Sequence, residues 1–281
     1  MHLYESAFQL RKPIVLAAFE GWNDAGESAS GALTHLLTTW THSLVASTDP
    51  EEYYDFQVNR PQIRVDEKVV REVIWPNTSI FEVSTPSLPH DFLIIKGIEP
   101  SMKWRTFAAE LLDLADDYEA SMLITLGALL ADAPHSRPIV VTGTGAHPDV
   151  AKRLGVEISK YEGPTGIIGV IQDAANRRDL DAISLWASVP HYVSTPPCPK
   201  ATLALINALE DFLDISIAQG DLPERALSWE KQVNQMASED SEVGDYVRQL
   251  ERNKDESELP SMSGEAIARE VERFLRRNPE F

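Results

Sequence analysis

The sequence predicts an α/β fold, a three-layer α/β/α sandwich with a C-terminal helical extension. Two observations carry this prediction. Short apolar runs with the length of buried strands alternate with helical patterns over residues 14–217. After Gly220 this alternation gives way to charged helical segments. With 281 residues, 43% of them hydrophobic, the chain is long enough to bury a substantial core. We therefore expect a sandwich domain in residues 1–220 and a helical extension in residues 221–281.

The alternating elements follow from hydrophobic periodicity. Runs of four to seven apolar residues are typical of buried strands, and apolar residues three and four positions apart are typical of helices. Strands separated by helices favour a mostly parallel sheet with helices on both faces. The predicted strands are residues 14–19, 44–47, 79–83, 92–96, 122–126, 138–142 and 183–189, and the best helical patterns are residues 102–118, 164–178 and 201–217.

Residues 52–72 interrupt the alternation. Three runs at 53–56, 63–65 and 69–73 are rich in aromatic and β-branched residues and have the composition of short strands joined by turns. They predict either a hairpin at the edge of the sheet or an insertion.

The extension differs from the rest of the chain in composition. Residues 221–281 contain 15 acidic and 9 basic residues. Apolar spacing predicts helices at 229–250 and 265–277, and the polar stretch 253–258 predicts a loop. Such a segment has too few apolar positions for a core of its own, so we expect it to pack on the main domain or on a neighbouring subunit.

The most informative segment is the strand, turn and helix over residues 13–37. The strand is followed by turn-forming residues and then by alanines and leucines at helical spacing. Open α/β sheets bind ligands at the carboxyl ends of their strands. The turn therefore supplies candidate pocket residues, namely Glu20, Trp22, Asn23, Asp24 and Gly26.

Two further segments complete this candidate pocket. His191 follows the predicted strand 183–189 and is expected at the same sheet edge as the turn. A second turn contributes Gly163, Thr165 and Gly166. A simpler interpretation gives the glycines a role in backbone shape and makes Asp24 the amino-terminal cap of the helix after the turn, and capping is the favoured of the two.

Acidic residues also follow several predicted strands. Glu99, Asp132 and Glu162 each come after a strand and are expected at the rim of the same sheet edge. Such a ring of acids would bind a cation or a basic peptide, or would be solvated.

Charge and targeting signals limit the classes of function. The net charge of −19 argues against binding to nucleic acid or to anionic membranes, because both require a positive surface. One cysteine, Cys198, cannot form a disulfide within the chain, and residues 1–12 lack the apolar stretch of a secretory signal. No run approaches the roughly 20 apolar residues of a membrane span. These features predict a cytoplasmic protein.

Motifs for cofactor chemistry are missing from the sequence. Gly143-Thr144-Gly145 lacks the third glycine of the dinucleotide fingerprint, and no Gly-Lys-Ser or Gly-Lys-Thr occurs. The histidines and the single cysteine show no metal-ligand spacing, and no Gly-x-Ser-x-Gly elbow is present. We therefore predict neither cofactor nor metal. A small anion at the helix amino ends after Gly145 or Thr165 is an open alternative.

Four spaced motifs resemble those of the proteasome assembly chaperone 2 family, and most closely its actinobacterial branch. The likeness covers residues 10 to about 220, and the 60-residue helical tail after it resembles an extension found in that branch. The motifs are Phe19-Glu20-Gly21-Trp22-Asn23-Asp24-Ala25-Gly26, Tyr54-Asp55-Phe56 with Arg60-Pro61, Leu130-Ala131-Asp132-Ala133-Pro134-His135-Ser136-Arg137-Pro138, and Gly163-Pro164-Thr165-Gly166.

This resemblance implies a fold similar to purine nucleoside phosphorylase and peptidyl-tRNA hydrolase and a tendency to form homo-oligomers, with a trimer favoured. It implies a non-catalytic, chaperone-like factor that binds protein partners. We expect apolar and aromatic groups of the tail and of residues 52–72 to form these contacts. The alternative is a small-molecule-binding protein, or a hydrolase or phosphorylase-like enzyme, that uses the Glu20 to Gly26 turn.

Overall fold

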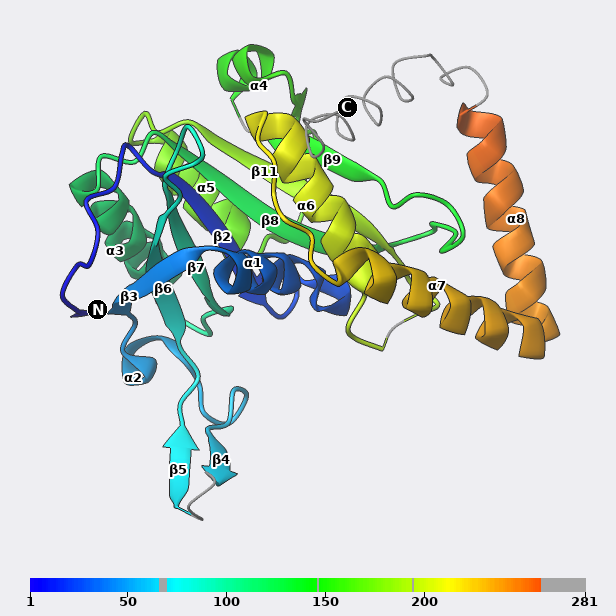
Figure 1. The fold of residues 1–281 in the computed structure, drawn as a ribbon, viewed down its shortest axis with the longest axis horizontal. Helices are drawn as coiled ribbons and strands as arrows, with labels where there is room; N and C mark the ends of the chain where they lie inside the picture. The colour runs from blue at the N-terminus through cyan, green and yellow to red at the C-terminus, as the bar shows by residue number, and fades with distance from the viewer. Residues whose placement is uncertain (66–69, 146, 194, 259–281) are drawn as a thin grey trace. The chain divides into compact units, whose positions relative to one another are not determined.

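The computed structural model describes residues 1–65, 70–145, 147–193 and 195–258. Its main feature is a nine-stranded sheet with the strand order β1-β3-β6-β7-β2-β8-β11-β9-β10 (Figure 1). A large central sheet flanked by helices confirms the predicted fold class. The strands of this sheet are β1 (His2–Leu3), β2 (Ile14–Glu20), β3 (Thr41–Ser47), β6 (Thr78–Ser84), β7 (Phe92–Ile98), β8 (Met122–Ala131), β9 (Val141–Gly145), β10 (Glu157–Ile158) and β11 (Ala182–Pro190).

The sheet is mixed. β2 pairs in parallel with β7 and β8, and β9 pairs in parallel with β10. On the other side of β7, the pairs β6–β7, β3–β6 and β1–β3 are antiparallel. The expectation of a mostly parallel sheet therefore holds around β2 and is wrong for the β1–β7 side. There, β6 and β7 are joined by a short turn, and only an antiparallel pair can be closed by such a turn.

The chain divides into two compact units. The first contains residues 1–24, 33–127 and 143–185, and the second contains residues 25–32, 128–142 and the chain from 186 onward. The division predicted at residue 220 stays a prediction. The helices are η1 (Ala25–Glu27), α1 (Ser28–Thr39), α2 (Pro50–Tyr53), α3 (Trp104–Asp117), α4 (Pro148–Leu154), α5 (Ile167–Asn176), α6 (Pro199–Leu213), α7 (Leu222–Glu239) and α8 (Ser241–Glu258).

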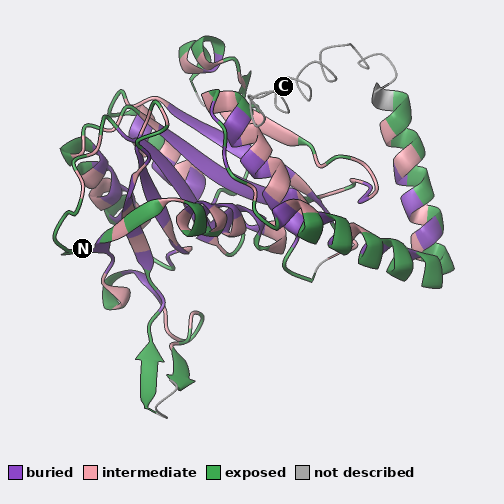
Figure 2. Cartoon of the chain, in the orientation of Figure 1, coloured by how far each residue is buried: buried purple, intermediate pink, exposed green. Residues whose placement is uncertain are grey.

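The core of the first unit lies around β2. Residues 14–19 of this strand are all buried, as expected of a strand inside a parallel region that is covered on both faces (Figure 2). Helices α3 and α5 pack against each other, and Phe107 of α3 meets Phe19 edge-to-face with ring centroids 5.7 Å apart. The continuous apolar run that predicted β2 is thus the centre of the core.

Two carboxylates hold the N-terminal segment against the first unit. Glu82 is fully buried in β6, and it accepts hydrogen bonds from the Ser6 hydroxyl at 2.8 Å and from the Phe8 amide at 3.0 Å. Asp91 accepts two hydrogen bonds from the Arg11 guanidinium, from Nε at 2.8 Å and from Nη2 at 2.9 Å. Both contacts join residues more than 70 positions apart and fix the approach to β2.

Residues 50–65 and 70–76 contain a helical turn and a separate two-stranded hairpin. Asp49 caps α2, since its carboxylate accepts a hydrogen bond from the Glu51 amide, so the predicted strand at 53–56 is wrong. Strands β4 (Gln62–Val65) and β5 (Arg71–Ile74) form a two-stranded antiparallel sheet of their own. This settles the sequence alternatives in favour of an insertion, and the hairpin extends away from the main sheet (Figure 1).

The second unit contains the three helices that end the described chain. Helix α6 packs on α7, and α7 packs on α8. The predicted helix 229–250 is divided in the structure, because the Asp240 carboxylate accepts hydrogen bonds from the amides of Glu242 and Val243 and starts a new helix. The predicted loop 253–258 is wrong, since α8 continues to Glu258. The predicted helix 265–277 lies outside the described residues.

Within the described ranges, no helix has the length and the apolar content that crossing a membrane requires.

Candidate functional site

The turn after β2 points its side chains in two directions. Gly21 has φ of +124°, a backbone conformation that L-residues rarely adopt, and its carbonyl accepts a hydrogen bond from the Asp24 amide at 3.1 Å. Trp22 is 64% exposed, whereas Asn23 and Asp24 are 3% and 5% exposed. The turn therefore presents one aromatic ring to solvent and buries its amide and carboxylate.

Asn23 and the second predicted loop meet at Glu99. The Glu99 carboxylate oxygen Oε1 accepts a hydrogen bond from Asn23 Nδ2 and another from the amide nitrogen of Ile167, both at 2.8 Å. Ile167 is the first residue of α5, and a negative charge is favourable at the positive end of a helix. The structure thus brings the turn 20–24 and the loop 163–166 together through a residue that the sequence placed only at the rim.

Gly166 is required by this close approach. A Cβ atom at Gly166 would lie 2.1 Å from Asn23 Nδ2, which is shorter than any real contact. Its φ of −94° is ordinary, so the reason for glycine is space and not backbone conformation. Gly163 differs, because its φ of +158° and the nearby Tyr161 ring both restrict a side chain.

The amino end of α5 is already occupied by a carboxylate of the chain. A free anion after Thr165 would need the helix amide that donates to Glu99. The anion alternative is therefore disfavoured at this end. After Gly145, helix α4 has only seven residues, and the His147 ring accepts a hydrogen bond from the Asp149 amide there at 3.4 Å.

Two of the predicted pocket residues, Gly26 and His191, belong to the second unit. Gly26 has φ of +62°, and its carbonyl accepts a hydrogen bond from the Cys198 amide at 2.7 Å. His191 follows β11, and its Nδ1 lies 3.2 Å from Asp132 Oδ1. The His191 ring also packs edge-to-face against Tyr246 of α8, with centroids 5.5 Å apart. His191 and Asp132 are thus brought together within this unit, and their described partners are other residues of that unit.

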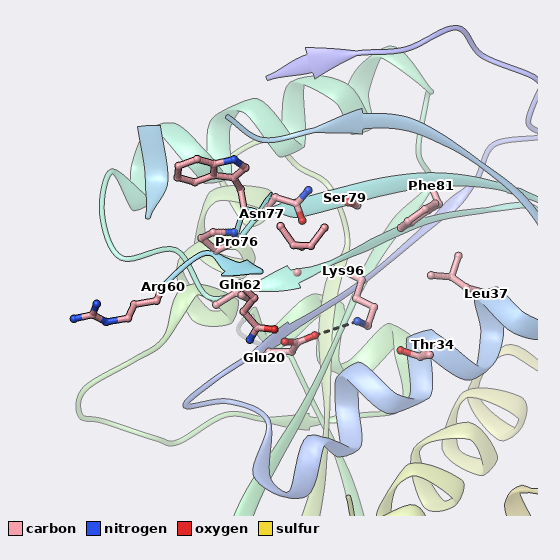
Figure 3. A pocket seen from close by; sticks show the side chains of 14 residues that line it. Glu20, Thr34, Leu37, Arg60, Gln62, Pro76, Asn77, Ser79, Phe81 and Lys96 are labelled. Carbon is pink, nitrogen blue, oxygen red and sulfur yellow. Dashed lines mark hydrogen bonds and ion pairs between the residues drawn. The ribbon is translucent and has the colours of Figure 1, made fainter. Parts of the chain in front are cut away.

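A cavity of about 410 Å³ opens beside Glu20 (Figure 3). Glu20 ends β2, and its carboxylate forms an ion pair with Lys96 Nζ of β7 at 3.1 Å. The cavity walls come from the end of α1, the base of the β4–β5 hairpin and strands β6 and β7. Its lining residues are Glu20, Thr34, Leu37, Arg60, Gln62, Ile74, Trp75, Pro76, Asn77, Ser79, Phe81, Lys96, Gly97 and Ile98.

Sequence reasoning identified Glu20 and missed the rest of this cavity. Lys96 carried a signal, because it is the only charged residue in the apolar run of β7 and stands near the carboxyl end of that strand. The hairpin residues carried none, since nothing local indicates that residues 60–62 and 74–77 border the same hollow as β2.

A buried polar network in the second unit was also missed. His135 is 1% exposed, and no local pattern in the sequence indicated its burial. The Tyr192 hydroxyl donates to His135 Nδ1 at 2.8 Å and accepts from the His135 amide at 2.8 Å, while Nε2 donates to Asn234 Oδ1 of α7 at 3.1 Å. Burial lowers the pKa of His135 and raises the pKa of Tyr192 to about 12.

The residues after His135 hold helix α8. The Arg137 guanidinium forms two hydrogen bonds with the Asp255 carboxylate, both at 2.8 Å, and the Ser136 hydroxyl donates to Glu251. Lys200 of α6 pairs with Glu230 of α7 at 2.5 Å. Polar contacts between distant segments thus hold α7 and α8 in place. In the portion of the chain that the structure describes, no three histidine, cysteine or acidic side chains gather in the manner of a metal site.

Comparisons with known proteins agree with the fold. A model of the PAC2 family matches residues 18–237. The crystal structure of a PAC2 family protein from Streptomyces avermitilis is 50% identical and has a TM-score of 0.78, covering 84% of this chain and 99% of that one. A proteasome-assembly chaperone homologue from Mycobacterium tuberculosis is 45% identical, with a TM-score of 0.76, and covers 83% of this chain and 99% of that one.

More distant structures share the fold alone. An archaeal proteasome activator from Pyrococcus furiosus is 19% identical, with a TM-score of 0.66, and covers 84% of this chain and 97% of that one. Among curated proteins, none matches this chain significantly.

Proposed function

We propose, from the premise that this chain belongs to the PAC2 family, that it is a non-catalytic, homo-oligomeric factor that binds protein partners. Its role would resemble that of the proteasome-assembly chaperone homologue from M. tuberculosis, to which it is 45% identical. The partner of first choice is a proteasome subunit, the favoured assembly is a trimer, and the expected location is the cytoplasm.

The observation that carries this proposal is the apolar surface of the β4–β5 hairpin. All eight strand residues are exposed, and Ile63, Val65 and Val73 are 58%, 52% and 48% exposed (Figure 2). Contiguous exposed apolar side chains are a mark of protein interaction sites. A surface of this kind suits a factor whose function is to contact other chains.

The turn after β2 supports the non-catalytic part of the proposal. Asn23 donates to Glu99, and Glu99 also accepts from the amide of Ile167, so both side chains have partners within the fold. Groups held in this way support the packing of α5 against the turn. A catalytic constellation would need convergent groups aimed at one concave site.

A co-purification experiment tests the proposal. The full chain, tagged and expressed in an actinobacterium, should elute as an oligomer in light-scattering chromatography and should retain proteasome α or β subunits after crosslinking. A chain that is monomeric at all concentrations and retains no proteasome subunit would contradict both parts. The variant Ile158→Ser removes an exposed apolar side chain of β10 and is the control for non-specific capture through apolar surface.

The cavity beside Glu20 favours a second candidate, a small-molecule-binding protein. Its volume of about 410 Å³ is within the range of ligand sites, and the Glu20–Lys96 ion pair places both signs of charge at its wall. A thermal-shift screen of metabolites tests this candidate, because a ligand that binds the folded state raises the melting temperature. Hits that persist in Lys96→Met would show binding elsewhere.

A further inference from the structure

One face of strands β6 and β7 lines the cavity of about 410 Å³ in the first unit. In the antiparallel register Ser79 is opposite Lys96, and Phe81 lies two positions further along β6, so these three side chains share a face. Ile80 and Ile95 alternate with them and are both buried in the core. The face that carries Lys96 is therefore one that the core does not fill.

The Glu20–Lys96 ion pair in the wall of this cavity has unused hydrogen-bonding capacity. Lys96 Nζ carries three hydrogens, and among the described residues it donates one hydrogen bond, to Glu20 Oε1 at 3.1 Å. In the same part of the chain no group donates to Glu20 Oε2. The two side chains are 43% and 24% exposed. A partly exposed ion pair contributes little to stability, so a ligand that offers each charge a partner can replace it at low cost.

The charge balance of the cavity favours a zwitterion. An anion bound at Lys96 would be repelled by Glu20, and a cation bound at Glu20 would be repelled by Lys96. Arg60 is the third charged residue of the lining, and Figure 3 shows its side chain pointing away from the ion pair. A ligand with one ammonium and one carboxylate gives each charge of the pair an opposite partner. The cavity therefore favours a ligand with both charges over a ligand with one.

An apolar wall lies next to the ion pair. Leu37 of α1 and Phe81 of β6 line the same cavity, and Figure 3 shows both on the side of Lys96 away from Glu20. The Phe81 ring packs edge-to-face against His42 with centroids 5.5 Å apart, so its position is set before a ligand binds. Burial of an apolar group against this wall would add to affinity, and a preformed wall lowers the entropy cost of binding.

The α-amino acids combine these three features on one carbon atom. Their ammonium, carboxylate and side chain are all attached to the α carbon, and such closely spaced charges match an ion pair whose Nζ and Oε1 atoms are 3.1 Å apart. In a peptide the two charges belong to different residues and are further apart. A cavity of about 410 Å³ is large enough for a free amino acid.

We infer that this cavity binds a free α-amino acid with an aliphatic or aromatic side chain. The Glu20 carboxylate accepts from the ligand ammonium, and Lys96 donates to the ligand carboxylate. The ligand side chain packs against Leu37 and Phe81. The inference rests on small-molecule binding, the second candidate for the proposed function, and names the class of ligand.

Matched ligands test the two charges on the unaltered full chain. Isothermal titration calorimetry should show saturable binding of L-phenylalanine or L-leucine. The amide of that amino acid lacks the carboxylate and mimics the amino end of a peptide, and its N-acetyl derivative lacks the ammonium and mimics the carboxyl end. Each should bind about tenfold more weakly, because it leaves one charge of the cavity without a partner. Affinity for either derivative equal to or above that for the amino acid would overturn the inference.

Substitutions test the location of the ligand. Lys96→Met and Glu20→Gln should each weaken binding about tenfold, since each removes one of the two charges. Lys152→Met removes an exposed lysine of α4 and is the matched control, which should bind the amino acid as wild type does. Binding that is unchanged in both cavity variants would place the ligand elsewhere and overturn the inference.

The outcomes separate this inference from the proposed function. If neither amino acid binds, and a metabolite of another class binds wild type but not Lys96→Met, the ligand class is wrong and the small-molecule candidate stands. If no compound binds, both are wrong. The proteasome-subunit capture tests the protein-binding proposal in either case.

Discussion

Glu99 Oε1 lies 2.8 Å from the amide nitrogen of Ile167 and ties the end of β7 to the first residue of α5. The same oxygen accepts from Asn23, so one carboxylate joins the turn after β2, the end of β7 and the start of a helix. These three segments lie more than 65 positions apart in the chain. The contact explains why Asn23 of the polar turn after β2 is buried.

Removing this carboxylate should destabilise the protein. Glu99→Ala leaves the Asn23 amide and the Ile167 amide without their shared acceptor, and hydrogen bonds to a charged group contribute up to about 3 kcal/mol. We expect urea unfolding to show a loss of about 2 kcal/mol in the free energy of unfolding. Glu162→Ala, an exposed carboxylate in the next loop, should change it little. Equal effects from both variants would contradict the role of Glu99.

Gly166→Ala should be destabilising, and Asn23→Ala should rescue part of the loss. The added methyl group would meet Asn23 Nδ2 at 2.1 Å, and overpacking of this kind costs about 1–3 kcal/mol. The double variant lacks the clash. Its loss in the free energy of unfolding should therefore be smaller than the sum of the losses in the two single variants. A double-mutant cycle by chemical unfolding measures this; strict additivity would show that the clash is relieved elsewhere.

The Arg11–Asp91 contact predicts a loss of stability in acid. Hydrogen bonding to Arg11 holds the pKa of Asp91 well below its usual range. The contribution of this contact to the free energy of unfolding is therefore fully present above the unfolded pKa of about 3.9. It is lost as pH falls toward the pKa of Asp91 in the folded chain. Asp91→Asn should be less stable than wild type at pH 7, and the difference should shrink below about pH 4. Asp149→Asn, which removes an exposed carboxylate, is the matched control and should change the stability at pH 7 little.

His135 predicts a second pH effect, of the same direction but in a different range. Burial lowers its pKa, although the hydrogen bond to Asn234 opposes this. The unfolded chain then binds a proton near pH 6.5 that the folded chain does not, so stability falls as pH decreases below about 6.5. Wild type should lose more stability between pH 7 and 5 than His135→Gln does. The exposed His42→Gln should follow wild type, and a wild-type slope in His135→Gln would contradict this role.

The elements that sequence predicted best are those with local causes. β2 was expected at residues 14–19 and runs from Ile14 to Glu20, because a strand buried on both faces is apolar at every position. The aromatic run at 53–56 suggested a strand and is partly helical, since Asp49 and Pro50 start α2 just before it. Here a local cap overrode β propensity.

Contacts between distant residues were beyond sequence reasoning. The loop expected at 253–258 is helical, and Asp255 in it pairs with Arg137, 118 positions away. The buried environment of His135 could not be predicted, because it depends on Tyr192 and Asn234, which no local pattern relates to it. In the predicted pocket, Glu99 is the shared hydrogen-bond acceptor of Asn23 and Ile167. Local sequence could not show this, because the fold brings these three residues together.

The division between α7 and α8 means that the two helices of the described extension are held separately. Asp240 ends one 18-residue helix and caps the next, so the two helices meet at this residue. Each helix makes its own polar contacts with other segments. Those of α7 involve Asn234 and Glu230, and those of α8 involve Glu251 and Asp255. The two helices are therefore attached to the rest of their unit through separate sets of polar contacts.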